Sequence, residues 1–164
     1  PPTARQFMRY LELSYQVLLL PAWFRNPEKR LAKQPKLHFV DPGLRRAILN
    51  RRGDADGAEF ESAVVAEIAK QCRTARAPVE FHHLRTADGR EVDLLVERDE
   101  GFVAVECKQT SRASAGDLRH LVGLDQLLDK PLLLSLIVSH DLRPRVLDPG
   151  PPPIWNVAAQ QLLS

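Results

Sequence analysis

The first fifty residues show two kinds of hydrophobic pattern, one helical and one typical of strands. Apolar side chains first recur at helical spacing and then come in short runs, separated by a turn and a basic stretch. The predicted elements are a helix over 3–15, strands over 17–20 and 37–40, and a short helix over 44–49. Asp41 suits the N-cap of the last helix, and Pro42 fits its first turn. This order is that of the back half of a winged-helix module, so residues 1–50 are expected to form a partial winged-helix-like basic module.

The polar stretch 51–57 contains two glycines and is the best domain boundary, with a second domain expected over 57–164. The Asp-Gly pair at 88–89 is a hairpin signal between two apolar runs. The predicted elements are a helix over 60–72, strands over 79–84, 91–97 and 102–108, a helix over 115–128, a buried strand over 131–139, an extended loop over 143–153, a strand over 154–157 and a small helix over 158–163. The fold class is therefore α/β (α+β), with a core of helix, three-stranded meander, helix and strand.

Charged side chains gather on two neighbouring strands of this meander. Strand residues two apart share a face, so Glu106 and Lys108 point the same way, beside Asp93 on the preceding strand. Glu61, at the start of a helix, is a candidate third carboxylate. Hard Mg²⁺ is held in proteins by one or two carboxylates, with substrate phosphate and water as further ligands. A catalytic site of these four residues is expected, with Asp93 and Glu106 as ligands of Mg²⁺ or Mn²⁺.

Lys108 completes this candidate site for phosphodiester chemistry. Its ammonium would orient the attacking water or stabilise charge on the phosphoryl oxygens. The alternative is structural, because an acid and a lysine two apart on a strand commonly form a solvated edge or a salt bridge.

Composition narrows the class of protein. The chain of 164 residues is 44% hydrophobic and 27% charged, which is typical of a globular protein, and no apolar run approaches the roughly 18 residues needed to span a bilayer. Cys72 and Cys107 form neither a zinc spacing nor a disulfide framework, so a cytoplasmic setting is expected and no membrane partner. Because the chain starts at Pro1 and its single methionine is Met8, it is expected to be part of a longer protein or a processed product.

The net charge of +2 hides a strong asymmetry. Residues 1–52 contain eleven Lys or Arg against three Asp or Glu, whereas the remainder contains twelve against eighteen. A basic segment beside a carboxylate-bearing one indicates a polyanion as partner, because phosphate contacts supply much of nucleic-acid affinity. The residues expected to contact phosphate are Arg25, Lys29, Arg30, Lys33 and Lys36. A solvated basic face, or one that docks onto an acidic partner domain, is the alternative.

The order of elements, with Asp on the second strand and Glu-x-Lys on the third, resembles the PD-(D/E)XK nuclease superfamily, which has the restriction-endonuclease-like fold. Glu61, Asp93, Glu106 and Lys108 occupy its four motif positions. Val92 stands in place of the proline of the name, at a position that varies and does not ligate metal. The resemblance implies a nuclease-like domain, and Mg²⁺-dependent hydrolysis of DNA is the expected activity. Hydrolysis of RNA is an alternative, because the same carboxylates could serve it.

A closer resemblance covers nearly the whole chain. It is similar to the domain found C-terminal to the ATPase core in many bacterial and archaeal AAA-type ATP-binding proteins. The matching segments are 9–13, 21–26, 29–31, PKLHFVDPGL at 35–44, 57–61, RTADGREVD at 85–93, and 105–108, where Cys107 replaces the usual valine.

That resemblance implies an ATPase domain in the same full-length chain. The sequence has no Gly-x-x-x-x-Gly-Lys-Ser/Thr loop, so ATP is expected to bind only in an upstream domain. A second function stays open, that of a noncatalytic DNA- or protein-binding module that regulates the attached ATPase.

Overall fold

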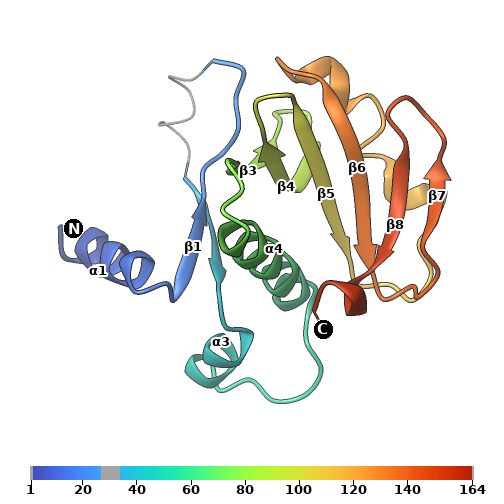
Figure 1. Cartoon of the computed structure of the whole chain (residues 1–164). Helices are drawn as coiled ribbons and strands as arrows, with labels where there is room; N and C mark the ends of the chain where they lie inside the picture. Colours follow the sequence, from blue (N-terminus) through green and yellow to red (C-terminus); the bar gives the residue numbers. More distant parts are fainter. Residues whose placement is uncertain (1, 27–33, 164) are drawn as a thin grey trace.

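The structure, a computed structural model, describes residues 2–26 and 34–163. This part of the chain is a mixed α/β structure with three α-helices, a six-stranded sheet and a separate two-stranded sheet (Figure 1). The α-helices are α1 (Pro2–Leu13), α3 (Pro42–Ile48) and α4 (Gly57–Thr74). The strands are β1 (Val17–Leu20), β2 (Lys36–Phe39), β3 (Glu80–Arg85), β4 (Glu91–Glu97), β5 (Phe102–Lys108), β6 (Leu132–Ser139), β7 (Arg145–Asp148) and β8 (Ile154–Ala158).

The six-stranded sheet is mixed, with the order β3-β4-β5-β6-β8-β7. Strands β3, β4 and β5 form the expected antiparallel meander, and β6 lies parallel to both β5 and β8. A parallel neighbour requires a long crossover, which the stretch between β5 and β6 provides. The two strands that carry the candidate chemistry, β4 and β5, have the bounds expected from the sequence.

Helix α4 covers one face of the sheet and begins with a capping box. Asp56 accepts a hydrogen bond from the Glu59 backbone N–H at 2.7 Å, and Glu59 accepts one from the Asp56 N–H at 3.0 Å. Behind this cap, Phe60, Val64 and Val65 are buried with apolar side chains of β4, β5 and β6. The cap therefore fixes the register of the helix that carries Glu61.

The opposite face is covered by 3₁₀ turns, not by the α-helix expected over 115–128. Two short 3₁₀ segments occur there, at Ala115–Leu118 and Leu124–Leu127. Gly123 has φ 68°, in the left-handed region, and this interrupts a continuous helix. The buried positions Leu118, Leu121, Leu124 and Leu128 nevertheless pack against the sheet, so the predicted apolar face is confirmed, whereas the predicted α-helix is wrong.

The loop expected over 143–153 contains an edge strand, β7, which pairs antiparallel with β8. Its first residue is anchored, because Arg145 reaches Asp141 at 2.8 Å and the Ala113 carbonyl at 2.7 Å. Prolines are tolerated beside an edge strand, since its outer N–H groups need no partner strand. Pro144 and Pro149 flank β7, and these prolines are the reason that a loop was predicted where the structure has a strand.

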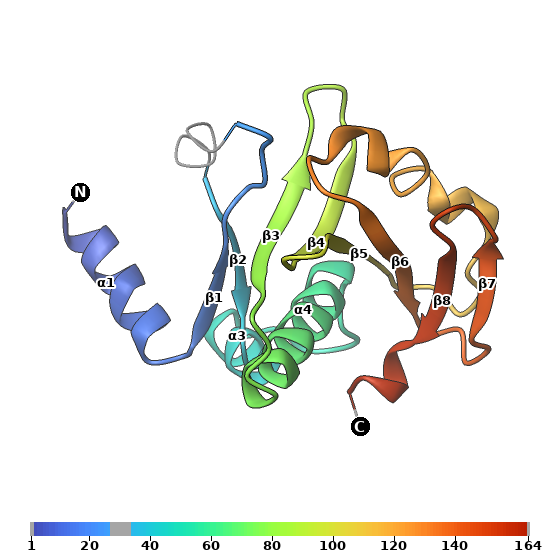
Figure 2. The same cartoon turned by 45° about the horizontal axis from the view of Figure 1, so that its top comes forward.

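The segment with β1 and β2 packs closely against the rest of the described chain (Figure 2). Trp23 N–H donates to the His83 carbonyl at 2.7 Å, and its side chain packs edge-on against Phe102 with ring centroids 5.6 Å apart. Leu18 and Leu20 join the core beneath α4. By contrast, α1 projects away from the sheet, as Figure 1 shows. The division into modules at 50 and 57 and the winged-helix likeness of the first remain predictions.

None of the described helices is long and apolar enough to cross a membrane.

Candidate functional site

The site lies where β4 and β5 separate. Their pairing ends at Leu94 opposite Val105, and beyond it the Cys107 N–H donates to Asp93 Oδ2 at 2.9 Å. On the other side of β4, His83 alone faces two residues, Asp93 and Leu94, so the strand bulges at this point. Bulges re-aim side chains and are frequent beside active sites. The carboxylate of Asp93 thus replaces a backbone acceptor and stands in the gap between the two strands.

Glu106 and Lys108 extend from β5 into the same region. Lys108 Nζ lies 2.8 Å from Glu106 Oε1, and Glu106 is only 3% exposed. Burial and the nearby Asp93 carboxylate raise the pKa of Glu106 to about 7, against the opposing effect of Lys108. Burial opposes the charge of Lys108, but the Glu106 carboxylate prevails and raises the pKa of the ammonium.

His120 faces the same carboxylate from the stretch between β5 and β6. Its Nδ1 lies 3.5 Å from Glu106 Oε1, while its Nε2 accepts a hydrogen bond from Arg119 Nε at 2.9 Å. Because Nε2 accepts, the ring proton of a neutral imidazole lies on Nδ1 and faces Glu106. His120 was not predicted as a site residue, because a contact between distant segments leaves no local pattern in the sequence.

Glu61 enters from the first turns of α4 and meets a lysine of β2. Lys36 Nζ lies 2.6 Å from Glu61 Oε1, 3.3 Å from Asp93 Oδ1 and 3.3 Å from Glu91 Oε1. Burial, together with the Asp93 carboxylate, raises the pKa of Glu61. Burial opposes the charge of Lys36 as well, but the surrounding carboxylates prevail and raise its pKa.

His38 supports Glu61 from the same strand as Lys36. Its Nε2 lies 3.7 Å from Glu61 Oε1, and its Nδ1 is 3.1 Å from Ser62 Oγ. Burial, assisted by the Lys36 charge, lowers the pKa of His38 to about 4, so the ring is neutral at pH 7. Lys36 and His38 are two apart on a strand and share a face, a signal that is present in the sequence, although only Lys36 was predicted as a site residue and only as a phosphate contact.

The structure therefore brings together all four of the expected catalytic residues, Glu61, Asp93, Glu106 and Lys108. Their oxygen donors are of the kind that hard Mg²⁺ or Mn²⁺ takes. Glu106 Oε2 is buried and has no hydrogen-bond partner among the described residues, so it is available as a ligand atom. The carboxylates of Glu61, Asp93 and Glu106 therefore fit a divalent cation by the type of their donor atoms, although these atoms do not converge as closely as those of the group described next.

A different group has the tightest convergence of possible metal ligands in the described chain. Glu80, His82 and Glu97, on β3 and β4, have ligand atoms that all lie within 4.8 Å of one another. Lys130 Nζ lies 2.8 Å from Glu97 Oε1 and already neutralises part of this group. It is a second place to which an added metal ion could go, and experiments on the first site need to control for it.

Two of the residues expected to contact phosphate have partners within the protein. Lys36 belongs to the carboxylate cluster, and Arg25 donates to the carbonyls of Leu128 at 2.9 Å and Gln126 at 3.3 Å. The three other candidates, Lys29, Arg30 and Lys33, lie outside the described residues. Phosphate binding by this segment stays a prediction.

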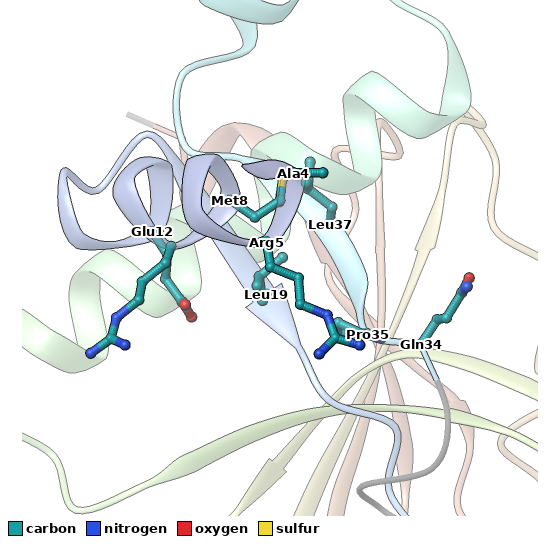
Figure 3. Close-up of a pocket in the computed structure, with 9 residues that line it drawn as sticks. Ala4, Arg5, Met8, Glu12, Leu19, Gln34, Pro35 and Leu37 are labelled. Atoms are coloured by element: carbon teal, nitrogen blue, oxygen red, sulfur yellow. The ribbon is translucent and has the colours of Figure 1, made fainter. Parts of the chain in front are cut away.

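Two of the cavities that border the N-terminal segment differ in character. One, of about 600 Å³, adjoins the cluster and is lined by Lys36, His83, Arg85 and Glu91 among others. The other, of about 700 Å³, is an apolar groove between α1 and the β1–β2 pair, with Met8, Leu19 and Leu37 on its walls (Figure 3). Neither cavity is lined by a candidate catalytic residue, but the smaller one reaches the carboxylate cluster through Lys36.

The comparisons with known proteins divide the chain close to residue 56. The family model described as "Domain of unknown function (DUF4143)" matches residues 56–146. The chain belongs to the DUF4143 family. This family is often associated with AAA-type ATPases. A second model, "Domain of unknown function (DUF8612)", matches residues 1–55. The cluster draws on both matches, because Lys36 and His38 come from the first 55 residues and the four catalytic candidates from the DUF4143 match.

Two curated relatives of this DUF4143 protein come from mycobacteria. It is 31% identical over 119 residues to the uncharacterized protein Mb2031c of Mycobacterium bovis and, to the same extent, to the uncharacterized protein Rv2008c of Mycobacterium tuberculosis. The match takes in 68% of this chain and 26% of each relative, so the chain spans about a quarter of their length. No solved structure matches it significantly.

Proposed function

We propose that the chain is the nuclease-like module of a longer protein and hydrolyses phosphodiester bonds of DNA with the help of Mg²⁺ or Mn²⁺. The observation that carries the proposal is the convergence of Glu61, Asp93, Glu106 and Lys108 at the point where β4 and β5 separate. A helix, a three-stranded meander and a parallel strand in the order β3-β4-β5-β6 support a restriction-endonuclease-like core. The partner of the module in this proposal is an ATPase domain in the same full-length chain, and its setting is the cytoplasm, where the free thiols of Cys72 and Cys107 stay reduced.

Each residue has a defined task in this proposal. Asp93 and Glu106 would hold the metal ion, which supplies Lewis acidity toward the phosphate and a more acidic bound water. Lys108, held 2.8 Å from Glu106, is placed to orient the attacking water and to stabilise negative charge on the phosphoryl oxygens. Glu61 would help to orient the attacking water or the Asp93 side chain.

Cleavage of labelled DNA tests the proposal. Duplex and single-stranded DNA are incubated with the protein and Mg²⁺ or Mn²⁺, and Lys108→Met and Asp93→Asn are compared with the wild type. Each substitution is expected to lower the cleavage rate by roughly a hundredfold or more, as removal of a charge-stabilising group does in other enzymes. Lys70→Met is the matched control, because Lys70 is an exposed lysine paired with Glu67 on α4. Cleavage that persists in purified Lys108→Met contradicts the catalytic role of Lys108. Cleavage of RNA but not of DNA would show that RNA is the substrate.

A noncatalytic module that binds DNA or protein and regulates the ATPase is the second candidate. Lys36 favours it, because one ammonium already neutralises Glu61 and Asp93 without any metal ion. Under this function Mg²⁺ and Mn²⁺ leave the melting temperature of a protein carrying Glu80→Gln unchanged, where Glu80→Gln removes a ligand of the second metal-ligand group. Under the first they raise it, since a ligand that binds only the folded state stabilises that state.

A further inference from the structure

The Lys36 ammonium contacts carboxylates from two different elements. Its Nζ is within 3.3 Å of side-chain oxygens of Glu61 on α4 and of Glu91 and Asp93 on β4. A cation shared by Glu61 and Asp93 would stand between the same two oxygens, Glu61 Oε1 and Asp93 Oδ1. The ammonium therefore holds the place of that cation.

The oxygen that Lys36 contacts on Asp93 is the one left for a ligand. Asp93 Oδ2 already accepts the hydrogen bond from the Cys107 N–H at 2.9 Å, whereas Oδ1 faces Lys36 at 3.3 Å. A divalent ion bound through Oδ1 would place two positive charges beside the ammonium, in surroundings where water screens poorly. The two cations exclude each other from this position.

Space for the displaced side chain lies directly beside the cluster. The cavity of about 600 Å³ is lined by Lys36 itself, with His83, Arg85 and Glu91 on its walls. Lysine carries its charge on a flexible four-carbon stem, so the ammonium can turn into the cavity while β2 keeps its pairing with β1. Glu91 on the cavity wall offers it a carboxylate there.

We propose that Lys36 is a tethered counter-ion that competes with the divalent ion for Glu61 and Asp93, so that the N-terminal segment sets the metal affinity of the site. The inference rests on the proposed function in one respect, that Asp93 binds a divalent ion, and it adds Glu61 to the ligands of that ion. Any shift of β2, for instance through a partner of residues 1–55, then changes how much metal the site retains. Lys36 acts on the metal ligands and is not itself a group that reacts with substrate.

Calorimetric titration of Mn²⁺ measures this competition directly. Three proteins are compared: Glu80→Gln as the reference, Glu80→Gln with Lys36→Met, and Glu80→Gln with the control Lys70→Met. Glu80→Gln removes an exposed ligand of the second metal-ligand group without disturbing the core. An opposite charge within 4–6 Å changes the proton affinity of a carboxylate by about 10- to 1,000-fold, so Lys36→Met is expected to bind Mn²⁺ roughly tenfold more tightly or better. Lys70→Met is expected to bind like the reference.

A purely structural lysine predicts a different result. If Lys36 only stabilises the fold, Lys36→Met melts at a lower temperature and its Mn²⁺ affinity is unchanged or weaker, and this outcome overturns the proposal. Lys36→Gln is the second variant, to be used if Lys36→Met does not fold, and its gain in melting temperature on adding Mn²⁺ should exceed that of the wild type.

The proposed function and this inference fail separately. Tighter Mn²⁺ binding by Lys36→Met without cleavage of DNA by any variant supports the counter-ion and contradicts the nuclease. Metal-dependent cleavage by the wild type with no change of Mn²⁺ affinity in Lys36→Met overturns the counter-ion and supports the nuclease.

Discussion

Glu106 is expected to titrate near pH 7 in the metal-free protein, and Asp93→Asn is expected to lower that midpoint. Burial and the Asp93 carboxylate raise the pKa of Glu106 from its ordinary 4.5 to about 7. Asp93→Asn removes the like charge and keeps the burial. A neighbouring charge shifts a pKa by about 1–3 units, so the midpoint should fall by about one unit or more. Lys108→Met removes the opposing cation and should raise the midpoint.

The same pKa shift predicts how stability depends on pH. Between pH 4.5 and about 7 the folded state keeps a proton on Glu106 that the unfolded state has lost, so stability decreases as pH rises through this window. The full difference corresponds to about 3 kcal/mol for a shift of this size. Glu106→Gln has no carboxyl to titrate and should lack this part of the decrease.

Carbon-13 NMR of labelled glutamate carboxyls follows the titration of Glu106, identified as the signal missing in Glu106→Gln. Urea unfolding at several pH values gives the stability. A Glu106 midpoint near 4.5, or one that Asp93→Asn leaves unchanged, refutes the reasoning, because the two carboxyls would then not share a poorly solvated site.

Four further results are expected. Trp23→Ala should destabilise by about 3–5 kcal/mol in urea unfolding, because the indole is 4% exposed and packs on Phe102, whereas a small effect would show that β1 and β2 are not anchored through it. Glu59→Gln should cost about 3 kcal/mol, since it leaves Arg45 and Arg46 without their buried carboxylate, while the exposed control Glu67→Gln should cost little. Arg145 holds the pKa of Asp141 down to about 2, so Asp141 contributes stability above pH 4 that is lost as the pH falls toward 2; Asp141→Asn should flatten that acid loss, and an unchanged acid profile would contradict it. DNA affinity should fall with salt by about 0.9 log units per log of salt for each phosphate contact. If a combined Lys29→Gln and Arg30→Gln change leaves this slope unaffected, these two residues do not contact phosphate.

Local patterns predicted most of the sheet that positions the site. The apolar runs and polar turns around β4 and β5 gave these strands their observed bounds, because strand period and hairpin signals are properties of adjacent residues. The stretch 115–128 was predicted less well. Its leucines have helical spacing, but Gly116 and Gly123 weaken an α-helix, and Gly123 adopts a left-handed conformation there.

Contacts between distant segments account for what the sequence did not reveal. Lys36 carries a basic side chain in a basic segment, so its charge indicated phosphate; only the pairing of β2 beside α4 places it against Glu61 and Asp93. His120 reaches Glu106 through a crossover whose path no local signal determines. Likewise, the bulge that turns Asp93 toward Cys107 follows from unequal spacing on two strands and not from either strand alone.

Crystals of the protein soaked in Mn²⁺ test the central claim most directly, because anomalous scattering locates the ion without any knowledge of the substrate. A peak beside Asp93 and Glu106, absent in Asp93→Asn, is the predicted result. Manganese found only at Glu80, His82 and Glu97, or no bound manganese at a concentration that saturates ordinary sites, would contradict a metal-dependent centre between β4 and β5.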